Sequence, residues 1–167
     1  MNRENLIALV TDVVREVLAR RSSGRKVALG SDHGGYELKQ RLKAYLEAQG
    51  HAVTDVGTHA KEACDYPDFA KAVGRAVQSG SCDLGVMIDG AGIGSSMVCN
   101  KLPGIRAALC YDMKTILNSR QHNNANVLTL GADTNPPEVV ENMVKTWLGT
   151  PFEGGRHQRR VDKIEST

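Results

Sequence analysis

Residues 84–96 read Leu84-Gly85-Val86-Met87-Ile88-Asp89-Gly90-Ala91-Gly92-Ile93-Gly94-Ser95-Ser96. A short apolar run followed by three glycines and two hydroxyl residues predicts a buried strand, a tight loop and the start of a helix. Glycine lets backbone N–H groups approach a ligand closely, and a helix N-terminus adds partial positive charge. The loop is therefore a candidate anion site, and Asp89 at its mouth is a candidate for proton transfer on a phosphorylated small molecule. The alternative is that the loop is only a sharp turn.

Strand and helix patterns alternate on both sides of this stretch. Strands are expected at 26–29, 51–56, 83–88, 105–110 and 126–130, and helices at 36–49, 67–78, 93–101, 113–119 and 136–148. Five β units separated by helices predict an α/β fold, a Rossmann-like three-layer sandwich whose five-stranded parallel sheet is flanked by helices. In such a sheet, ligands bind at the carboxyl ends of the strands, near a topological switch point.

The first 25 residues differ from the rest of the chain. Residues 4–20 carry apolar side chains three and four apart, which predicts an amphipathic helix, and residues 20–25 have the composition of a flexible linker. The apolar stripe needs a partner surface, either on residues 26–167 or on a second copy of the chain. The segment also resembles the encapsulation peptides that target enzymes into bacterial microcompartments, which implies docking to shell proteins.

Composition excludes several classes of protein. The formal net charge of +2 is too small to indicate a nucleic-acid partner. No apolar stretch reaches the roughly 18 to 20 residues that span a bilayer, and no signal peptide is recognisable. The four cysteines form no CxxC pair and have no metal-ligand spacing with the five histidines, so we expect free thiols, a cytoplasmic protein and no metal site.

Chemistry-bearing residues follow the expected strands. Asp32 and His33 come after the first strand; Asp32 could cap the next helix, whereas His33, beside two glycines, suits phosphate binding or proton transfer. Residues 119–126 are rich in amides and contain His122, so they form either a polar connector or a clamp on substrate hydroxyls. Arg156 and Arg160, four residues apart, would share a helical face as a solvated tail or as a phosphate site.

Five motifs in order carry a family resemblance: Ser31-Asp32-His33, Asp65-Tyr66-Pro67, Gly90-Ala91-Gly92-Ile93-Gly94, Ser119-Arg120-Gln121-His122-Asn123 and Gly154-Gly155-Arg156-His157. Together they make residues 26–162 resemble the family of ribose-5-phosphate isomerase B and the galactose-6-phosphate isomerase subunits. Residues 26–167 would then be a sugar-phosphate isomerase domain with a C-terminal helical tail.

The resemblance implies an intramolecular oxidoreductase that interconverts aldose and ketose phosphates through a cis-enediolate without metal or organic cofactor. It implies a homodimer or tetramer whose active sites are shared across the interface, with the two arginines supplied by the partner. Backbone amides of the glycine loop would stabilise the enediolate oxygen. The implied substrate-binding residues are Asp32, His33, Tyr66, Gly90, Gly92, Ile93, Gly94, Asn123, Arg156 and Arg160; His122 would assist opening of the sugar ring.

The chain departs from the family pattern at the centre of the implied site. Asp89 stands where cysteine is commonest, Ala91 where threonine or serine is usual, and Asp133 where an arginine usually contributes to phosphate binding. Some members use a glutamate base at the position of Ser95. In one account Asp89 replaces the thiolate as base and the hydroxyls of Ser95 and Ser96 replace the missing one; the catalytic residues are then Asp89, His122 and Ser95. In the other, the chain acts on another sugar phosphate or binds one without turnover.

Overall fold

The computed structural model describes residues 5, 6 and 24–166. The predicted N-terminal helix at 4–20 therefore lies almost entirely outside the described residues, as does most of the predicted linker. Among the described residues, no helix has both the length and the apolar character that crossing a bilayer requires.

The centre of the fold is a five-stranded sheet in which all neighbouring strands are parallel. The strands are β1 (Lys26–Ser31), β2 (Ala52–Asp55), β3 (Leu84–Asp89), β4 (Ala107–Leu109) and β5 (Val127–Gly131), in the order β2-β1-β3-β5-β4. The central strand β3 is buried along its whole length, as expected of an apolar strand covered on both faces. The predicted fold class and the five parallel strands are confirmed.

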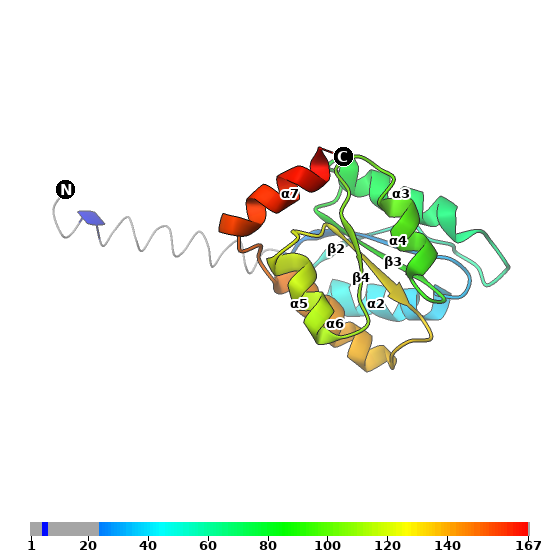
Figure 1. Ribbon diagram of the computed structural model, residues 1–167. Helices are drawn as coiled ribbons and strands as arrows, with labels where there is room; N and C mark the ends of the chain where they lie inside the picture. The colour runs from blue at the N-terminus through cyan, green and yellow to red at the C-terminus, as the bar shows by residue number, and fades with distance from the viewer. Residues whose placement is uncertain (1–4, 7–23, 167) are drawn as a thin grey trace.

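Helices cover both faces of the sheet (Figure 1). On one face lie α2 (Tyr36–Ala48), α5 (Met113–Gln121) and α6 (Pro137–Gly149), and on the other lie α3 (Tyr66–Gln78) and α4 (Ile93–Cys99). The larger core lies beneath the first group, where Leu42, Ile116 and Trp147 are fully buried. The 3₁₀ helix η1 (Gly155–His157) and helix α7 (Gln158–Glu165) complete the chain.

Most predicted boundaries differ from the observed ones by one or two residues, and two differences have clear causes. Helix α4 stops at Cys99 rather than at residue 101, because the side chain of Asn100 exchanges two hydrogen bonds with the backbone of Ala107. Helix α5 continues past the predicted end at Ser119 to Gln121, because Ser119 is buried and accepts a hydrogen bond from Trp147 Nε1 at 3.1 Å.

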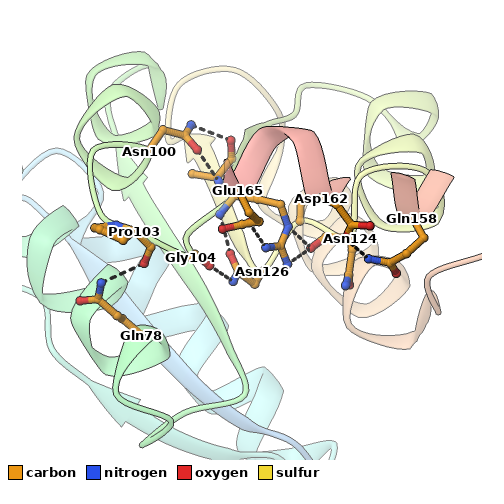
Figure 2. A network of polar contacts seen from close by, with 12 residues as sticks. Gln78, Asn100, Pro103, Gly104, Asn124, Asn126, Gln158, Asp162 and Glu165 are labelled. Atoms are coloured by element: carbon orange, nitrogen blue, oxygen red, sulfur yellow. Dashed lines mark hydrogen bonds and ion pairs between the residues drawn. The ribbon is translucent and has the colours of Figure 1, made fainter. Parts of the chain in front are cut away.

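A polar network ties α7 to the start of β4 (Figure 2). Glu165 forms an ion pair with Arg106, and Arg106 Nη2 donates to the backbone oxygen of Asn124 at 2.8 Å. Asn126 Nδ2 donates to the backbone oxygen of Gly104 at 2.8 Å. The network therefore gathers the turn before β5, the start of β4 and the C-terminal helix at one edge of the sheet.

The loops after β1 and β3 meet at the opposite, carboxyl-terminal edge. These two strands are neighbours although β2 lies between them in sequence. The chain leaves β1 toward β2 on one side and leaves β3 toward β4 on the other, which makes this position a topological switch point. Asp32 N donates to the backbone oxygen of Ile88 at 3.3 Å, so the residue that follows β1 contacts the backbone near the end of β3.

Candidate active site

The glycine loop 90–94 closes over the end of β3 and starts α4. Gly92 is the N-cap of α4 and has a φ of 77°, in the left-handed region where a side chain would be strained. A Cβ at Gly94 would lie 2.4 Å from atoms of the Tyr66 ring, so this glycine allows the ring to rest on the loop. Gly92 therefore allows the turn of the loop, and Gly94 leaves room for the ring of Tyr66, which comes from the start of α3.

The carboxylate of Asp89 is turned into this loop and is only 5% exposed. Its Oδ1 accepts from the backbone N–H groups of Ala91, at 2.9 Å, and of Gly92. Its Oδ2 accepts from Ser95 N at 3.2 Å and from the Ser95 hydroxyl. An ionised carboxylate has about four lone-pair sites, so these four donors occupy all of them.

This arrangement bears directly on proton transfer. A general base needs a lone pair directed at the proton it removes. Three of the donors to Asp89 are backbone N–H groups held by the loop, whereas the fourth, the Ser95 hydroxyl, sits on a rotatable bond. Rotation of that hydroxyl is therefore the smallest change that would free Oδ2.

The loop after β1 lies beside the glycine loop. Asp32 is 7% exposed, and its Oδ1 accepts from Gly35 N at 3.0 Å. Gly35 is itself the N-cap of α2, so Asp32 holds the turn before the helix and does not cap it as predicted. His33 is exposed, and its Nδ1 accepts from Cys64 N at 3.2 Å and lies 3.8 Å from Cys64 Sγ. The carboxyl edge thus gathers Asp32, His33, Tyr66, Asp89 and the glycine loop, which we call the loop group.

His122 belongs to a second group of predicted residues. Its imidazole stacks on that of His157, with ring centroids 4.2 Å apart and planes within 5°. Glu153 Oε2 lies 3.7 Å from Nε2 of each ring, and Arg156 Nε donates to His157 Nε2 at 3.4 Å. We call His122, Asn123, Glu153, Arg156, His157 and Arg160 the amino-edge group.

The two groups lie at opposite edges of the sheet. Helix α5 starts after β4 at the carboxyl edge and runs back antiparallel to the strands, so His122 at its C-terminus lies near the start of β5. Glu153 N donates to Gln121 O at 3.0 Å, which brings the segment before η1 to the same edge. Within a single copy of the chain the two groups are therefore separate, and a site shared between two copies stays a prediction.

Four further motif or site residues can be compared with the expectations from the sequence. Arg120 is 7% exposed, donates to the backbone oxygens of Thr150 and Ala125, and has its pKa lowered by burial to about 10. Arg156 lies in the 3₁₀ helix and Arg160 in α7, so they do not share one regular α-helix as predicted. Asp133 is exposed, and its backbone N–H donates to Gly90 O at 3.5 Å, which places it next to the loop.

Sequence reasoning missed four residues that contact the predicted ones. Cys64 contacts His33, Glu153 faces both stacked histidines, and Asn118 Nδ2 lies 2.9 Å from His122 Nδ1. Tyr111 donates its hydroxyl hydrogen to the loop oxygen of Ala91 at 2.9 Å. Only Asn118 had a usable signal, since it lies one helical turn before His122.

The side chains of His122, Glu153 and His157 have donor atoms within 4.8 Å of one another, which is a donor set that could hold a divalent metal. However, His157 Nε2 already accepts a hydrogen bond from a guanidinium group, and that cation would repel a metal ion. A separate feature is a groove of about 630 Å³ along the outer edge of β4, between α5 and α7. Its lining includes Asn118 and Asn123 but no member of the loop group.

Comparison with known proteins identifies the family. The family model for ribose/galactose isomerases matches residues 27–164. Ribose-5-phosphate isomerase B of Escherichia coli (strain K12) is 44% identical over 140 residues, covering 84% of this chain and 94% of that protein. The solved structures of ribose-5-phosphate isomerase B from Clostridium thermocellum and Thermotoga maritima superpose with a TM-score of 0.83 each, at 48% and 43% identity. These alignments cover 84% and 86% of this chain and 95% and 99% of those chains. The chain belongs to the ribose/galactose isomerase family.

Proposed function

We propose that this family member interconverts an aldose phosphate and a ketose phosphate, either ribose 5-phosphate and ribulose 5-phosphate or a close analogue, through a cis-enediolate. Two relatives named ribose-5-phosphate isomerase B are 44% and 48% identical to this chain over the aligned residues, so sugar-phosphate isomerisation is the activity that the family supports. The observation that carries the assignment of the base is the position of Asp89. It is a buried carboxylate at the end of the central strand, inside an anion-binding loop, at the position of the family's usual cysteine.

In the proposed reaction, Asp89 removes the proton from C2 of the open-chain aldose. The Ser95 hydroxyl turns from Oδ2 of Asp89 toward a substrate oxygen, and Oδ2 accepts the C2 proton. The electron pair of the C–H bond forms the C1–C2 double bond, and the carbonyl oxygen becomes the enediolate oxygen. Asp89 then returns the proton to C1, and the proton of the C2 hydroxyl passes to the enediolate oxygen on C1. C2 thereby becomes the carbonyl carbon and C1 carries the hydroxyl, so the ketose forms with no net gain or loss of protons.

The amino-edge group supplies the rest of the proposed site from a second copy of the chain. Arg156 and Arg160 are exposed cations suited to a phosphate, and His122 would contact the ring oxygen of the cyclic sugar. Because this group and the loop group lie at opposite edges of the sheet, the loop group of one protomer would meet the amino-edge group of its partner. A homodimer, or a tetramer of two such dimers, is therefore part of the proposal.

The test combines turnover with proton exchange. Wild type, Asp89→Asn and Asp89→Cys are assayed with ribose 5-phosphate and with allose and deoxy analogues, and deuterium incorporation at C2 is followed by NMR in deuterated water. We expect Asp89→Asn to lose roughly 10²- to 10⁴-fold in kcat, the usual contribution of a positioned base. Asp89→Cys, which restores the family's residue, should retain more activity than Asp89→Asn. Equal rates for wild type and Asp89→Asn would remove Asp89 from its role.

A second candidate function is a sugar-phosphate-binding protein with little or no turnover. It is favoured by one observation: the N–H groups of Ala91, Gly92 and Ser95 already donate to Asp89, so they do not face a substrate oxyanion. The exposed carboxylate of Asp133 near the loop also opposes a dianionic phosphate there. Ligand binding without deuterium incorporation at C2 in the wild type would support this candidate.

Residues 1–25 lie outside the family match at 27–164 and carry a separate proposal. Their amphipathic pattern and linker composition support a docking tag for microcompartment shell proteins, so that the isomerase would work inside a microcompartment of the cytoplasm.

A further inference from the structure

The imidazole of His122 is contacted at Nδ1 by a side chain outside the family motifs. Asn118 and His122 lie one turn apart at the end of α5, and Asn118 Nδ2 is 2.9 Å from His122 Nδ1. The ring is also fixed from two other sides, because His157 stacks on its face and Glu153 lies near its Nε2. Which nitrogen of His122 carries the proton therefore depends on which way the Asn118 amide faces.

A backbone carbonyl settles the orientation of that amide. Asn123 Nδ2 lies 3.3 Å from the backbone oxygen of Asn118 and 3.1 Å from Oδ1 of the same residue. A backbone oxygen only accepts, so the Asn123 atom that faces it must be the amino group, whose two hydrogens serve both oxygens. Oδ1 of Asn118 is thereby an acceptor turned toward Asn123, and its own amino group is turned toward His122. This assignment comes from the hydrogen-bond network, as any amide orientation must.

The consequence for His122 follows from donor and acceptor chemistry. An amide N–H that points at Nδ1 requires a lone pair there, so the neutral ring carries its proton on Nε2. Adding a second proton at Nδ1 would set two N–H groups against each other at 2.9 Å. Asn118 cannot turn its oxygen to relieve this without losing its bond from Asn123.

We propose that Asn118 is a positioning residue that holds His122 as the neutral tautomer with its proton on Nε2, so that this N–H donates a hydrogen bond to a sugar oxygen. That the acceptor is a sugar oxygen rests on the proposed function. The protonation state of the ring rests only on the hydrogen bonds of Asn118 and Asn123. His122 then acts as a neutral hydrogen-bond donor in the partner's active site, and not as an imidazolium acid.

The experiment reads the ring nitrogens directly. Two-bond ¹H–¹⁵N spectra of uniformly ¹⁵N-labelled full-length protein are recorded at about pH 8.5, well above the ordinary histidine pKa near 6.5, with the His122 signals identified by their loss in His122→Gln. Two variants are compared with wild type: Asn118→Leu, which removes the donor at similar volume, and Asn118→Asp, which replaces it with an acceptor. Asn118 is exposed on α5, so both substitutions are compatible with the fold.

We expect the neutral ring of wild-type His122 to carry its proton on Nε2 alone, the ring in Asn118→Leu to show both neutral tautomers, and the ring in Asn118→Asp to carry its proton on Nδ1. If wild type and Asn118→Leu show the same tautomer populations, or Asn118→Asp leaves the proton on Nε2, the inference is overturned. A loss of about tenfold or more in kcat is expected for Asn118→Asp near neutral pH, since a wrongly protonated catalytic histidine is costly. If the three proteins show the expected tautomers but wild type turns over no sugar phosphate, the proposed function is overturned and the tautomer assignment stands.

Discussion

The imidazole rings of His122 and His157 stack face to face, 4.2 Å apart, although 35 positions separate them in the chain (157 − 122). One closes helix α5 and the other closes the 3₁₀ helix, and Glu153 faces the Nε2 atoms of both. The pair joins two family motifs that the sequence shows only as separate segments, and it makes the protonation of His157 matter for stability.

Stability should fall on mild acidification because of His157. Burial of the ring lowers the pKa of His157, and repulsion from His122 and Arg156 lowers it further. The unfolded chain, with a histidine pKa near 6.5, then binds more protons than the folded chain, so stability is full above about pH 6.5 and declines as pH falls toward the lowered value. Thermal unfolding at pH 7.5 and 5.5 should show a smaller decrease in Tm for His157→Asn than for wild type.

The control for this prediction is the exposed His59, whose replacement by glutamine should leave the decrease in Tm unchanged. Some dependence should remain in His157→Asn, because burial also lowers the pKa of His51. A decrease of the same size in wild type and His157→Asn would contradict the assignment.

Replacing Ser95 by alanine should destabilise the protein by about 1.5–3 kcal/mol, the usual worth of a hydrogen bond to a charged group. The substitution removes the hydroxyl donor from the buried carboxylate of Asp89. Urea unfolding measures the effect. Ser96→Ala is the matched control, since this neighbour is half-buried and its hydroxyl faces Asn100 Nδ2 at 3.5 Å, and its effect should stay within about 0.5 kcal/mol. Equal effects of the two substitutions would contradict the role of Ser95.

Mixing two inactive variants should restore activity if the site is shared between protomers. Asp89→Asn damages the loop group and His122→Gln damages the amino-edge group, so a heterodimer of the two contains one intact site and one doubly damaged site. Random reassembly in a two-fold dimer predicts recovery of about one quarter of the wild-type rate per chain. Subunits are exchanged through mild denaturant and assayed with ribose 5-phosphate. If the mixture is no more active than the separate variants, the site is not shared between protomers: either both groups serve a site within one protomer, or they serve no common site.

Removing the charge of Asp55 should cost about 3–5 kcal/mol, because it leaves a buried ammonium without a counter-ion. Lys39 Nζ lies 2.6 Å from Asp55 Oδ2, and the two side chains are 0% and 9% exposed. Asp55→Asn is compared by urea unfolding with Glu37→Gln, which breaks the exposed pair between Lys61 and Glu37. The exposed pair should contribute less than about 1 kcal/mol. A similar, small loss in both variants would show that Lys39 finds another partner or reaches solvent.

The N-terminal proposal predicts a cellular phenotype. Residues 1–20 fused to a fluorescent protein should co-localise with microcompartment shell proteins, because the apolar stripe of the predicted helix needs a surface to cover it. A fusion that carries charged residues in place of Val10 and Val14 is the control and should be diffuse. Diffuse fluorescence of the unmodified fusion would count against docking.

The sequence by itself determined the parallel α/β sheet, because the alternation of apolar strands and amphipathic helices and the glycine positions are local patterns with local causes. It also indicated that Asp89 ends a buried strand beside a tight loop, since the run Leu84–Ile88 and the glycines that follow are contiguous. The order of the strands was not readable in this way. Only the packed sheet makes β1 and β3 neighbours and brings Asp32, after β1, into contact with the end of β3.

Tertiary structure alone decided where the side chains face. Three of the four donors to Asp89 are backbone N–H groups of a loop that turns at the left-handed Gly92, so residue identity did not reveal that the carboxylate is fully occupied. The motifs did not show which residues one chain brings together: α5 runs back across the sheet and carries His122 to the edge opposite Asp89. Periodicity specifies which residues are helical, whereas the direction in which a helix crosses the sheet depends on contacts between segments distant in sequence.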